Sequence, residues 1–260
     1  MSSSSHLPLV SCLCLTKDRP QHLRRAIRCF LSQSYPRKEL IVVHPPSDQT
    51  TVDCLAEFDN PQIQSRGVTL TGGTLGQLRN MSIDLATGEY ACVWDDDDWY
   101  SPERIQRQYQ ALEATKKDAC VLSMLFIFDS RRQKGYLNHR LWENSVFFNR
   151  QEIQRLGINY PPMDKSEDYH FVNALIKANL VYPLYDPTLY VYQITGSNTW
   201  DDSHFEIMLR RSMELTPDQT AIVQKCFDET VSTNYVYEAM QSSAFKRYLP
   251  YVRYSAIPRG

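Results

Sequence analysis

The chain has 260 residues, of which 42% are hydrophobic and 22% are charged. This length and composition predict one large domain with a sizeable core, with or without a small appendage. The formal net charge of −2 gives no overall field that would select nucleic acid or an anionic membrane. The sequence contains no run of eighteen apolar residues, so it predicts no transmembrane helix.

The chain begins with a serine-rich stretch and carries seven dispersed cysteines. Residues 1–7 lack the basic region and the apolar core of a signal peptide, so we expect a disordered leader there. The cysteine count is odd, and Cys12 and Cys14 have no second pair at zinc-ribbon spacing. We therefore expect all seven to be reduced core residues of a cytoplasmic protein.

The first half of the chain alternates between strand and helix patterns. Short apolar runs predict buried strands at Leu9–Leu15, Leu40–Val43 and Tyr90–Trp94. Apolar residues at helical spacing, with prolines at two starts, predict helices at Pro20–Ser34, Thr51–Phe58, Leu75–Ala86 and Pro102–Thr115. Units of about 30 residues of this kind predict βαβ crossovers and a mostly parallel sheet, which binds ligands beyond the carboxyl ends of its strands.

The pattern changes after residue 115. We expect a long apolar strand at Cys120–Phe128, a polar turn region at Arg131–Asn138 and another strand at Leu141–Phe148. This half is therefore predicted to form a mixed or antiparallel sheet. The last sixty residues predict helices at His204–Met213, Pro217–Glu229 and Val236–Phe245.

Four consecutive aspartates, Asp95–Asp98, follow the third predicted strand. Packing four like charges costs free energy unless a cation or water neutralises them. Carboxylate oxygens suit a hard divalent ion such as Mg²⁺ or Mn²⁺, which can bridge them to phosphate oxygens. A solvated acidic turn is the alternative, but the flanking Trp94 and Trp99 argue against it because tryptophan prefers burial or an interface.

Several segments together resemble the family 2 glycosyltransferases over residues 8 to 200. The segments are Val10–Pro20, Leu31–Pro36, Glu39–Val43, Gly73–Asn80, Ala86–Tyr90, the aspartate run, Pro102–Ile105, Trp142–Ser145, Phe148–Arg150 and Ser166–Tyr169. No single segment is specific, but the ordered set is. The resemblance implies a GT-A fold, with a nucleotide-sugar-binding half at 8–115, an acceptor half at 116–200 and a helical C-terminal extension at 201–260.

The resemblance also implies how a nucleotide-sugar donor is held. In that family an Asp-x-Asp segment binds the donor through a divalent metal, Mn²⁺ or Mg²⁺. Here it maps to Asp95, near the ribose and the metal, and to Asp97 as the metal ligand. The remaining donor-binding candidates are Thr16, Asp18, Arg19, Asp48, Arg79 and Asp96. For Asp98 a helix cap or turn role and a metal role stay open.

The same resemblance assigns catalysis to an acidic pair that opens a helix. Asp168 takes the place of the catalytic base, and Glu167 either shares this role or orients the acceptor or a basic neighbour. An inverting transferase needs one carboxylate to accept the proton of the attacking hydroxyl. Two helix-start acids after a capping Ser166 are the structural alternative. Trp142 and Glu143 are acceptor-binding candidates, with a core role the alternative for Trp142.

The sequence departs from the family pattern at two places. His44–Asp48 stand where relatives carry acidic residues that read the nucleotide base, so UDP- and GDP-linked donors both stay open. Thr195 stands near the place of a histidine that contacts metal or diphosphate in many relatives. The loop from Thr195 to Trp200 is expected to close over the donor, with Gly196 as hinge.

The C-terminal stretch 245–259 holds four cations, no acid and several aromatics. It suits either packing on the main domain or peripheral contact with the inner face of a membrane; nucleic-acid binding is the weaker option.

Taken together, these features predict a metal-dependent, inverting hexosyltransferase-type enzyme that moves a sugar from a nucleotide-sugar donor to a carbohydrate or other hydroxyl acceptor. The alternatives are a non-catalytic nucleotide-sugar-binding module, a nucleotidyltransferase of similar fold, and a glycoside hydrolase that would work without metal.

Overall fold

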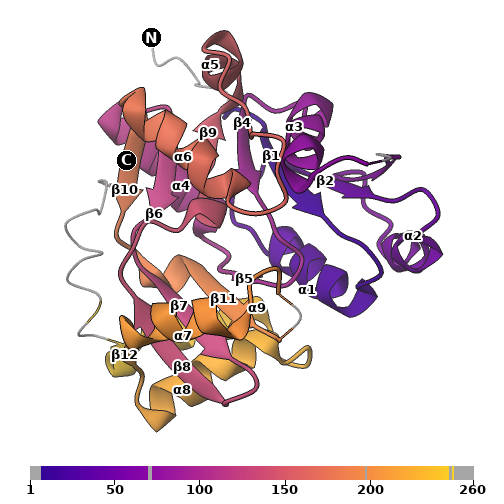
Figure 1. The fold of residues 1–260 in the computed structure, drawn as a ribbon. Helices are drawn as coiled ribbons and strands as arrows, with labels where there is room; N and C mark the ends of the chain where they lie inside the picture. Colours follow the sequence, from indigo (N-terminus) through magenta and orange to yellow (C-terminus); the bar gives the residue numbers. More distant parts are fainter. Residues whose placement is uncertain (1–6, 70–71, 197, 246–247, 249–260) are drawn as a thin grey trace, which may run out of the picture.

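A seven-stranded sheet forms the larger part of the molecule (Figure 1). The computed structural model describes residues 7–69, 72–196, 198–245 and 248. The strands of this sheet, in spatial order, are β3 (Ile63–Gly67), β2 (Lys38–His44), β1 (Val10–Leu15), β4 (Tyr90–Val93), β9 (Phe147–Asn149), β6 (Ala119–Leu122) and β10 (Val181–Leu184). All neighbouring pairs are parallel except those of β9, which runs antiparallel to β4 and β6. The predicted mostly parallel sheet is therefore confirmed.

Helices cover both faces of this sheet. On one face, apolar residues of α1 (Pro20–Leu31), α2 (Gln49–Ala56) and α4 (Arg104–Thr115) share a core with Cys12 and Cys14. The helices that share a core with Leu13 on the opposite face are α3 (Leu75–Leu85), α5 (Arg150–Arg155) and α6 (Glu167–Lys177). Side chains alternate between the two faces of a strand, so an apolar strand such as β1 fills both cores. All seven cysteines are free and buried, as predicted from the sequence.

A smaller mixed sheet lies beside the first, with the C-terminal helices around it (Figure 1). Its strands, in spatial order, are β12 (Met213–Glu214), β8 (Lys134–Asn138), β7 (Leu125–Asp129), β11 (Tyr190–Ile194) and β5 (Trp99–Tyr100). The remaining helices are α7 (Asp202–Arg210), α8 (Pro217–Gln224), α9 (Thr233–Met240) and the 3₁₀ turns η1 (Glu143–Ser145), η2 (Pro187–Leu189), η3 (Lys225–Phe227) and η4 (Ser243–Phe245). The second sheet is thus built from both halves of the chain.

The single long strand expected at Cys120–Phe128 is wrong. The segment forms two strands, β6 in the first sheet and β7 in the second, separated by Ser123 and Met124. Both strands are buried throughout, so the apolar run continues across the break and hides it. The amide of Ser123 donates to the carbonyl of Leu184, the last residue of β10, where the chain leaves the first sheet.

Three further local expectations needed correction. The polar region Arg131–Asn138 is mostly strand, because β8 forms a hairpin with β7 and the turn before it places Gln133 at φ 53°. The expected strand Leu141–Phe148 is instead η1 followed by the short β9. Strand β3 was not expected from the sequence. It lies at the edge of the sheet and is half exposed, so its residues show no apolar run or alternation that would indicate a strand.

The last sixty residues are largely helical as expected, and the described part packs against the rest of the molecule. Phe245 contacts Phe126 of β7 edge to face, and Phe227 stacks on Phe128 of the same strand. Residues 1–6 of the expected leader and most of the basic stretch 245–259 lie outside the described residues, whereas Leu7 packs against the core. Within the described residues, no helix has the length and apolar composition needed to cross a bilayer.

The first sheet reverses its winding direction at β1. Strand β2 pairs with one edge of β1 and β4 pairs with the other, although β4 comes much later in the chain. Open α/β sheets bind ligands outside the carboxyl ends of the strands at such a switch point. Thr16 directly follows β1, and Asp95 follows β4 with only Trp94 between, so the topology brings these polar segments together.

Candidate functional site

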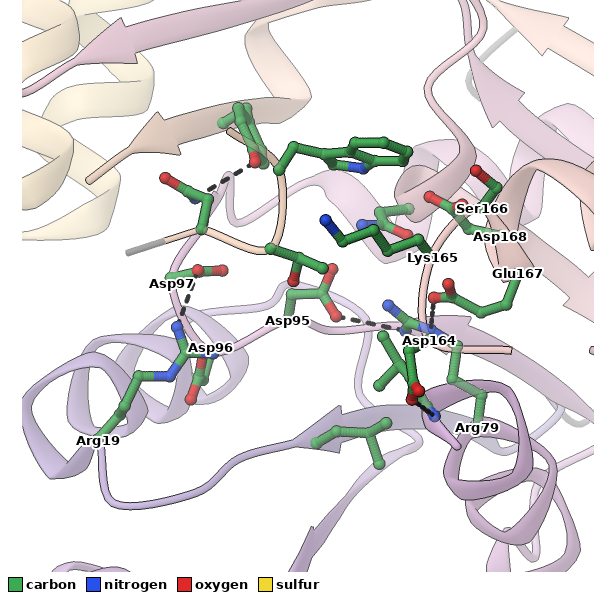
Figure 2. Close-up of a pocket in the computed structure, with 17 residues that line it drawn as sticks. Arg19, Arg79, Asp95, Asp96, Asp97, Asp164, Lys165, Ser166, Glu167 and Asp168 are labelled. Atoms are coloured by element: carbon green, nitrogen blue, oxygen red, sulfur yellow. Dashed lines mark hydrogen bonds and ion pairs between the residues drawn. The ribbon is translucent and has the colours of Figure 1, made fainter. Parts of the chain in front are cut away.

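The four aspartates after β4 occupy different environments. Asp95, Asp96 and Asp97 line a cavity of about 170 Å³ at the switch point, and Figure 2 shows their carboxylates. Asp98 points away from this cavity: it is fully buried and accepts hydrogen bonds from the hydroxyl of Tyr190 and the amide of Gln193. It is not the cap of α4, since the residue at that position is Glu103. Asp98 therefore ties the aspartate run to β11.

Crowding and burial disturb the acidity of the run. Burial, followed by repulsion from Asp97, raises the pKa of Asp96 to about 7, against the opposing charge of Arg19. Burial also raises the pKa of Asp95, with Arg79 acting in the opposite direction. The pKa of Asp98 is raised well above its usual range by burial and then by Asp97 and Asp95. Ionising these carboxyls therefore costs free energy, and a bound cation would lower that cost.

Two arginines bracket the run. Arg19 lies 3.0 Å from both Asp96 and Asp97, although it donates a hydrogen bond only to Asp97. Arg79, which is buried on α3, lies 3.4 Å from Asp95 and donates from Nε to Glu167 at 3.0 Å (Figure 2). Thr16 reaches the same place, since its hydroxyl donates to Asp96 at 2.6 Å. The structure thus brings Thr16, Arg19 and Arg79 to the run, as the sequence suggested.

The acidic pair opens α6 on the opposite wall of the cavity. Glu167 is buried against Arg79, and its pKa is raised by burial, with the Arg79 charge opposing and Asp168 adding repulsion. Asp168 is less buried and lines two adjoining cavities. Ser166 stands at the N-cap position at φ 64°, but its side chain makes no capping hydrogen bond. Of the two acids, Asp168 is therefore the more accessible, and it lines both cavities.

The second cavity, of about 210 Å³, adjoins the first through Asn144, Ser166, Asp168, Tyr192 and Trp200. Trp142 lines it and is 8% exposed; its ring lies 4.8 Å from that of Tyr192. Glu143 also lines it, paired with Arg140 at 2.6 Å, and burial raises the pKa of its carboxyl. Trp142 and Glu143 thus lie together beside Asp168.

A third, more apolar cavity of about 380 Å³ lies at the ends of β1, β2 and β3. Its lining includes Thr16, Lys17, His44 and Ser47, together with Leu15, Val43, Pro45, Pro46, Val68, Thr69 and Leu78. The histidine ring is occupied by contacts with Ser65 at 2.8 Å and the carbonyl of Pro45 at 2.9 Å. The size and apolar lining suit a flat heterocyclic ring.

Two predicted donor-binding residues lie apart from these cavities. Asp48 caps α2 by accepting from the amide of Thr51, and it also accepts from both threonine hydroxyls of that turn. It accepts from the amide of Asp18 too, which stands at φ 52°. Neither Asp18 nor Asp48 is among the residues that line the three cavities. The Asp48 carboxylate thus links the loop between β1 and α1 to the start of α2.

Several lining residues were not anticipated from the sequence. Asp164, Lys165 and Asn198 line the first cavity, and Asn144, Tyr192 and Trp200 line both. The loop that was predicted to close over the donor supplies two of them, Asn198 and Trp200. Within this loop, the side chain of Asn198 accepts a hydrogen bond from the amide of Thr195 and donates one to the carbonyl of Gln193. Asp164 and Lys165 directly precede the recognised Ser166–Tyr169 segment, and this proximity was the available signal.

The carboxylate oxygens of the first cavity fit a hard cation that is held only partly by protein ligands. The first cavity is lined by three cationic side chains (Arg19, Arg79, Lys165) and six carboxylates (Asp95, Asp96, Asp97, Asp164, Glu167, Asp168). Arg19 engages one oxygen of Asp97 and Arg79 one oxygen of Asp95, which leaves the second oxygen of each outside these pairs. Within the described residues, no three metal-binding side chains gather around one point. Such a site suits Mg²⁺ or Mn²⁺ completed by phosphate oxygens and water.

Comparison with known sequences gives one family. A model described as glycosyl transferase family 2 matches residues 11–180. The chain is 34% identical over 102 residues to the putative colanic acid biosynthesis glycosyl transferase WcaA of Escherichia coli, which covers 38% of this chain and 36% of that protein. The chain spans less than half the length of the curated relatives it matches.

Comparison with solved structures gives the GT-A fold, as expected. Staphylococcus aureus TarS residues 1–349 in complex with UDP-GlcNAc align with a TM-score of 0.62 and 14% identity, covering 95% of this chain and 80% of that one. The mannosyltransferase PcManGT from Pyrobaculum calidifontis, in complex with GDP-Man and Mn²⁺, aligns with a TM-score of 0.59 and 14% identity, covering 98% and 77%.

Proposed function

The chain belongs to glycosyl transferase family 2, and from this premise we propose that it transfers a sugar from a nucleotide-sugar donor to a hydroxyl acceptor. One observation carries the proposal: the aspartate run after β4 and the acidic pair of α6 face each other across one cavity, linked by Arg79. A transferase needs these two groups together, one to hold the diphosphate and one to accept a proton.

We place the donor across the first and third cavities. Thr16 and Lys17 line the third cavity, while Thr16 also donates to Asp96 beside the first, so a nucleoside and its diphosphate can span this boundary. The donor is UDP- or GDP-linked in this proposal. TarS binds UDP-GlcNAc and PcManGT binds GDP-Man, which supports both classes. Among the described residues that line the third cavity, none carries a charged acceptor for either base.

We assign a divalent ion to Asp97 and Asp95, with Mn²⁺ or Mg²⁺ as the candidates. The crowded carboxylates and the Mn²⁺ in PcManGT support this assignment. When bound, such an ion would neutralise negative charge on the diphosphate leaving group. Arg19 holds Asp97 in place, and Arg79 holds Asp95 and Glu167 at a fixed separation.

Asp168 is the catalytic base in this proposal. The acceptor hydroxyl loses its proton to the Asp168 carboxylate as its oxygen attacks the anomeric carbon. The bond from that carbon to the diphosphate oxygen breaks on the opposite face, which inverts the configuration. Glu167 is buried and engaged by Arg79, so we assign it a positioning role.

The acceptor occupies the second cavity, against Trp142 and Glu143. Aromatic rings and a carboxylate suit the apolar faces and hydroxyls of a carbohydrate. The adjoining position of Asp168 on the wall shared by both cavities supports this placement. A contribution of residues 245–259 to acceptor or membrane binding stays a prediction, because most of that stretch lies outside the described residues.

Titration calorimetry with UDP and GDP, in Mn²⁺ and in chelator, tests the proposal. We expect one diphosphate to bind in Mn²⁺ and to lose most of its affinity in chelator. Slow release of sugar from the matching nucleotide sugar should accompany binding. Undiminished binding in chelator would contradict the metal assignment, and binding with no turnover on any acceptor would favour a binding module.

A further inference from the structure

Lys165 differs from the other two cations of the first cavity. Arg19 is already paired with Asp96 and Asp97, and Arg79 with Asp95 and Glu167. Each guanidinium is thus shared between two carboxylates and has little charge left for a ligand. Among the described residues, no carboxylate lies within ion-pair distance of the Lys165 ammonium.

The Lys165 ammonium instead rests on an aromatic ring. Its Nζ lies 5.2 Å from the centre of the Trp200 ring, which belongs to the loop after β11. The positive charge of Lys165 has only a small effect on the nearby Asp201 carboxylate, because hydrogen bonds from Ser203 and His204 lower the pKa of that carboxyl more. A cation–π contact at an exposed site is weaker than a charge-assisted hydrogen bond to a phosphate oxygen. The ammonium can therefore leave the Trp200 ring to bind a phosphate oxygen.

The backbone of Lys165 is nevertheless fixed. The preceding Asp164 accepts from the amide of Leu75 at 2.9 Å, and the carbonyl of Met163 accepts from the amide of Gly76 at 3.0 Å. Both contacts anchor the segment to the first turn of α3. Figure 2 shows the Lys165 side chain extended into the cavity between Asp95 and the acidic pair. A flexible cation on a fixed backbone thus lies above the proposed diphosphate site.

We propose that Lys165 binds the terminal phosphate of the nucleoside diphosphate and stabilises it as the leaving group; this rests on the proposed function. As the sugar–oxygen bond breaks, its electron pair stays on that phosphate oxygen, which gains one negative charge. The acceptor oxygen forms the new bond to the sugar, and its proton goes to Asp168. A cation that is not committed to a carboxylate neutralises the added charge most effectively.

The test compares nucleoside diphosphates with monophosphates. Lys165→Met, Lys165→Arg and the unaltered protein are titrated with UDP, UMP, GDP and GMP at one Mn²⁺ concentration. Loss of a charged hydrogen bond predicts diphosphate binding about 10- to 100-fold weaker in Lys165→Met. Monophosphate binding should change less than about twofold, because the contacted phosphate is absent. Lys165→Arg should recover most of the diphosphate affinity.

Lys177→Met is the matched control, because Lys177 is an exposed lysine at the far end of α6. It should bind both nucleotides like the unaltered protein. Equal weakening of diphosphate and monophosphate in Lys165→Met, or no weakening, would overturn the inference and leave the proposed function intact. If the unaltered protein binds no nucleoside diphosphate, the proposed function and this inference both fall.

Discussion

Adjacent aspartates in this chain have opposite structural roles. Asp97 is partly exposed, pairs with Arg19 and lines the first cavity, whereas the next residue, Asp98, is buried and accepts from Tyr190 and Gln193. The repeat of four identical residues conceals this difference in the sequence. It arises because β11, more than ninety residues later, supplies the donors for only one of them.

Alanine substitutions should separate these roles. Asp98→Ala leaves the Tyr190 hydroxyl and the Gln193 amide buried without their acceptor, which should lower the free energy of unfolding by roughly 2–5 kcal/mol. Asp97→Ala loses only a partly exposed ion pair and should cost less than about 1 kcal/mol. Chemical denaturation of both variants without metal measures the difference. Calorimetry should show that Asp97→Ala loses Mn²⁺-dependent diphosphate binding; equal stability losses would contradict the distinction.

Asp168→Asn tests the proposed base. An amide keeps the size of the side chain but accepts no proton, so donor binding should persist while transfer falls by about two to four orders of magnitude. The assay follows sugar transfer, or donor hydrolysis until an acceptor is found. Asp84→Asn, an exposed acid on α3, is the control and should keep full activity. Near-normal transfer by Asp168→Asn would leave Asp168 as a helix-start acid and make Glu167 the next candidate.

At the level of elements, the first turn of α3 positions the acidic pair. Gly76 on α3 is buried against the segment that leads into α6, and a Cβ built on it would overlap the carbonyl oxygen of Pro161 and approach Glu167 Cβ to 3.4 Å. The close approach allows Leu75 and Gly76 to hydrogen-bond to Asp164 and Met163. Glycine at this position thus sets the distance between two helices that carry Arg79 and Glu167.

Gly76→Ala should therefore impair both stability and activity. The added methyl group meets backbone rather than a flexible side chain, so the segment before α6 must move, at a cost of about 1–3 kcal/mol. Transfer should decline more than nucleotide binding, because the acidic pair shifts relative to the aspartate run. Gly67→Ala is the control, since its Cβ would meet Pro46 at an ordinary 3.4 Å. Unchanged denaturation midpoints and rates would show that the segment adapts.

At the scale of the whole molecule, the C-terminal helices complete the core of the second sheet. Val223, Val236, Met240 and Phe245 are buried in the same cluster as strands β7 and β11. Our division at residue 200 stays a prediction, but this packing argues that the helices stabilise the sheet whose strand β11 leads into the loop with Asn198 and Trp200.

Met240→Ala tests whether this region is integral. Truncating a fully buried methionine in a shared core should lower the free energy of unfolding by about 2–5 kcal/mol in a single transition. Tyr235→Ala on the same helix is the control, because Tyr235 is 52% exposed and should cost little. A separate, early transition in Met240→Ala would instead show that the C-terminal helices unfold independently.

The sequence by itself determined the alternation of strand and helix, the mostly parallel sheet and the segments that meet at its edge. These features follow from local periodicity and from the rule that parallel strands end together, so β1 and β4 could be predicted from the sequence pattern, whereas the helix start at the acidic pair came from the family resemblance. The family resemblance added the identity of the fold and the candidate roles of Asp97 and Asp168.

Only the tertiary structure decided the rest. Cys120–Phe128 divides between two sheets because a strand buried on both faces has the same apolar pattern in either sheet. Asp98 accepts hydrogen bonds from β11, and Lys165 lies on Trp200, because residues distant in the sequence supply these partners. Periodicity places a residue on an element, but its charge is neutralised, buried or left free by residues that are distant in the sequence.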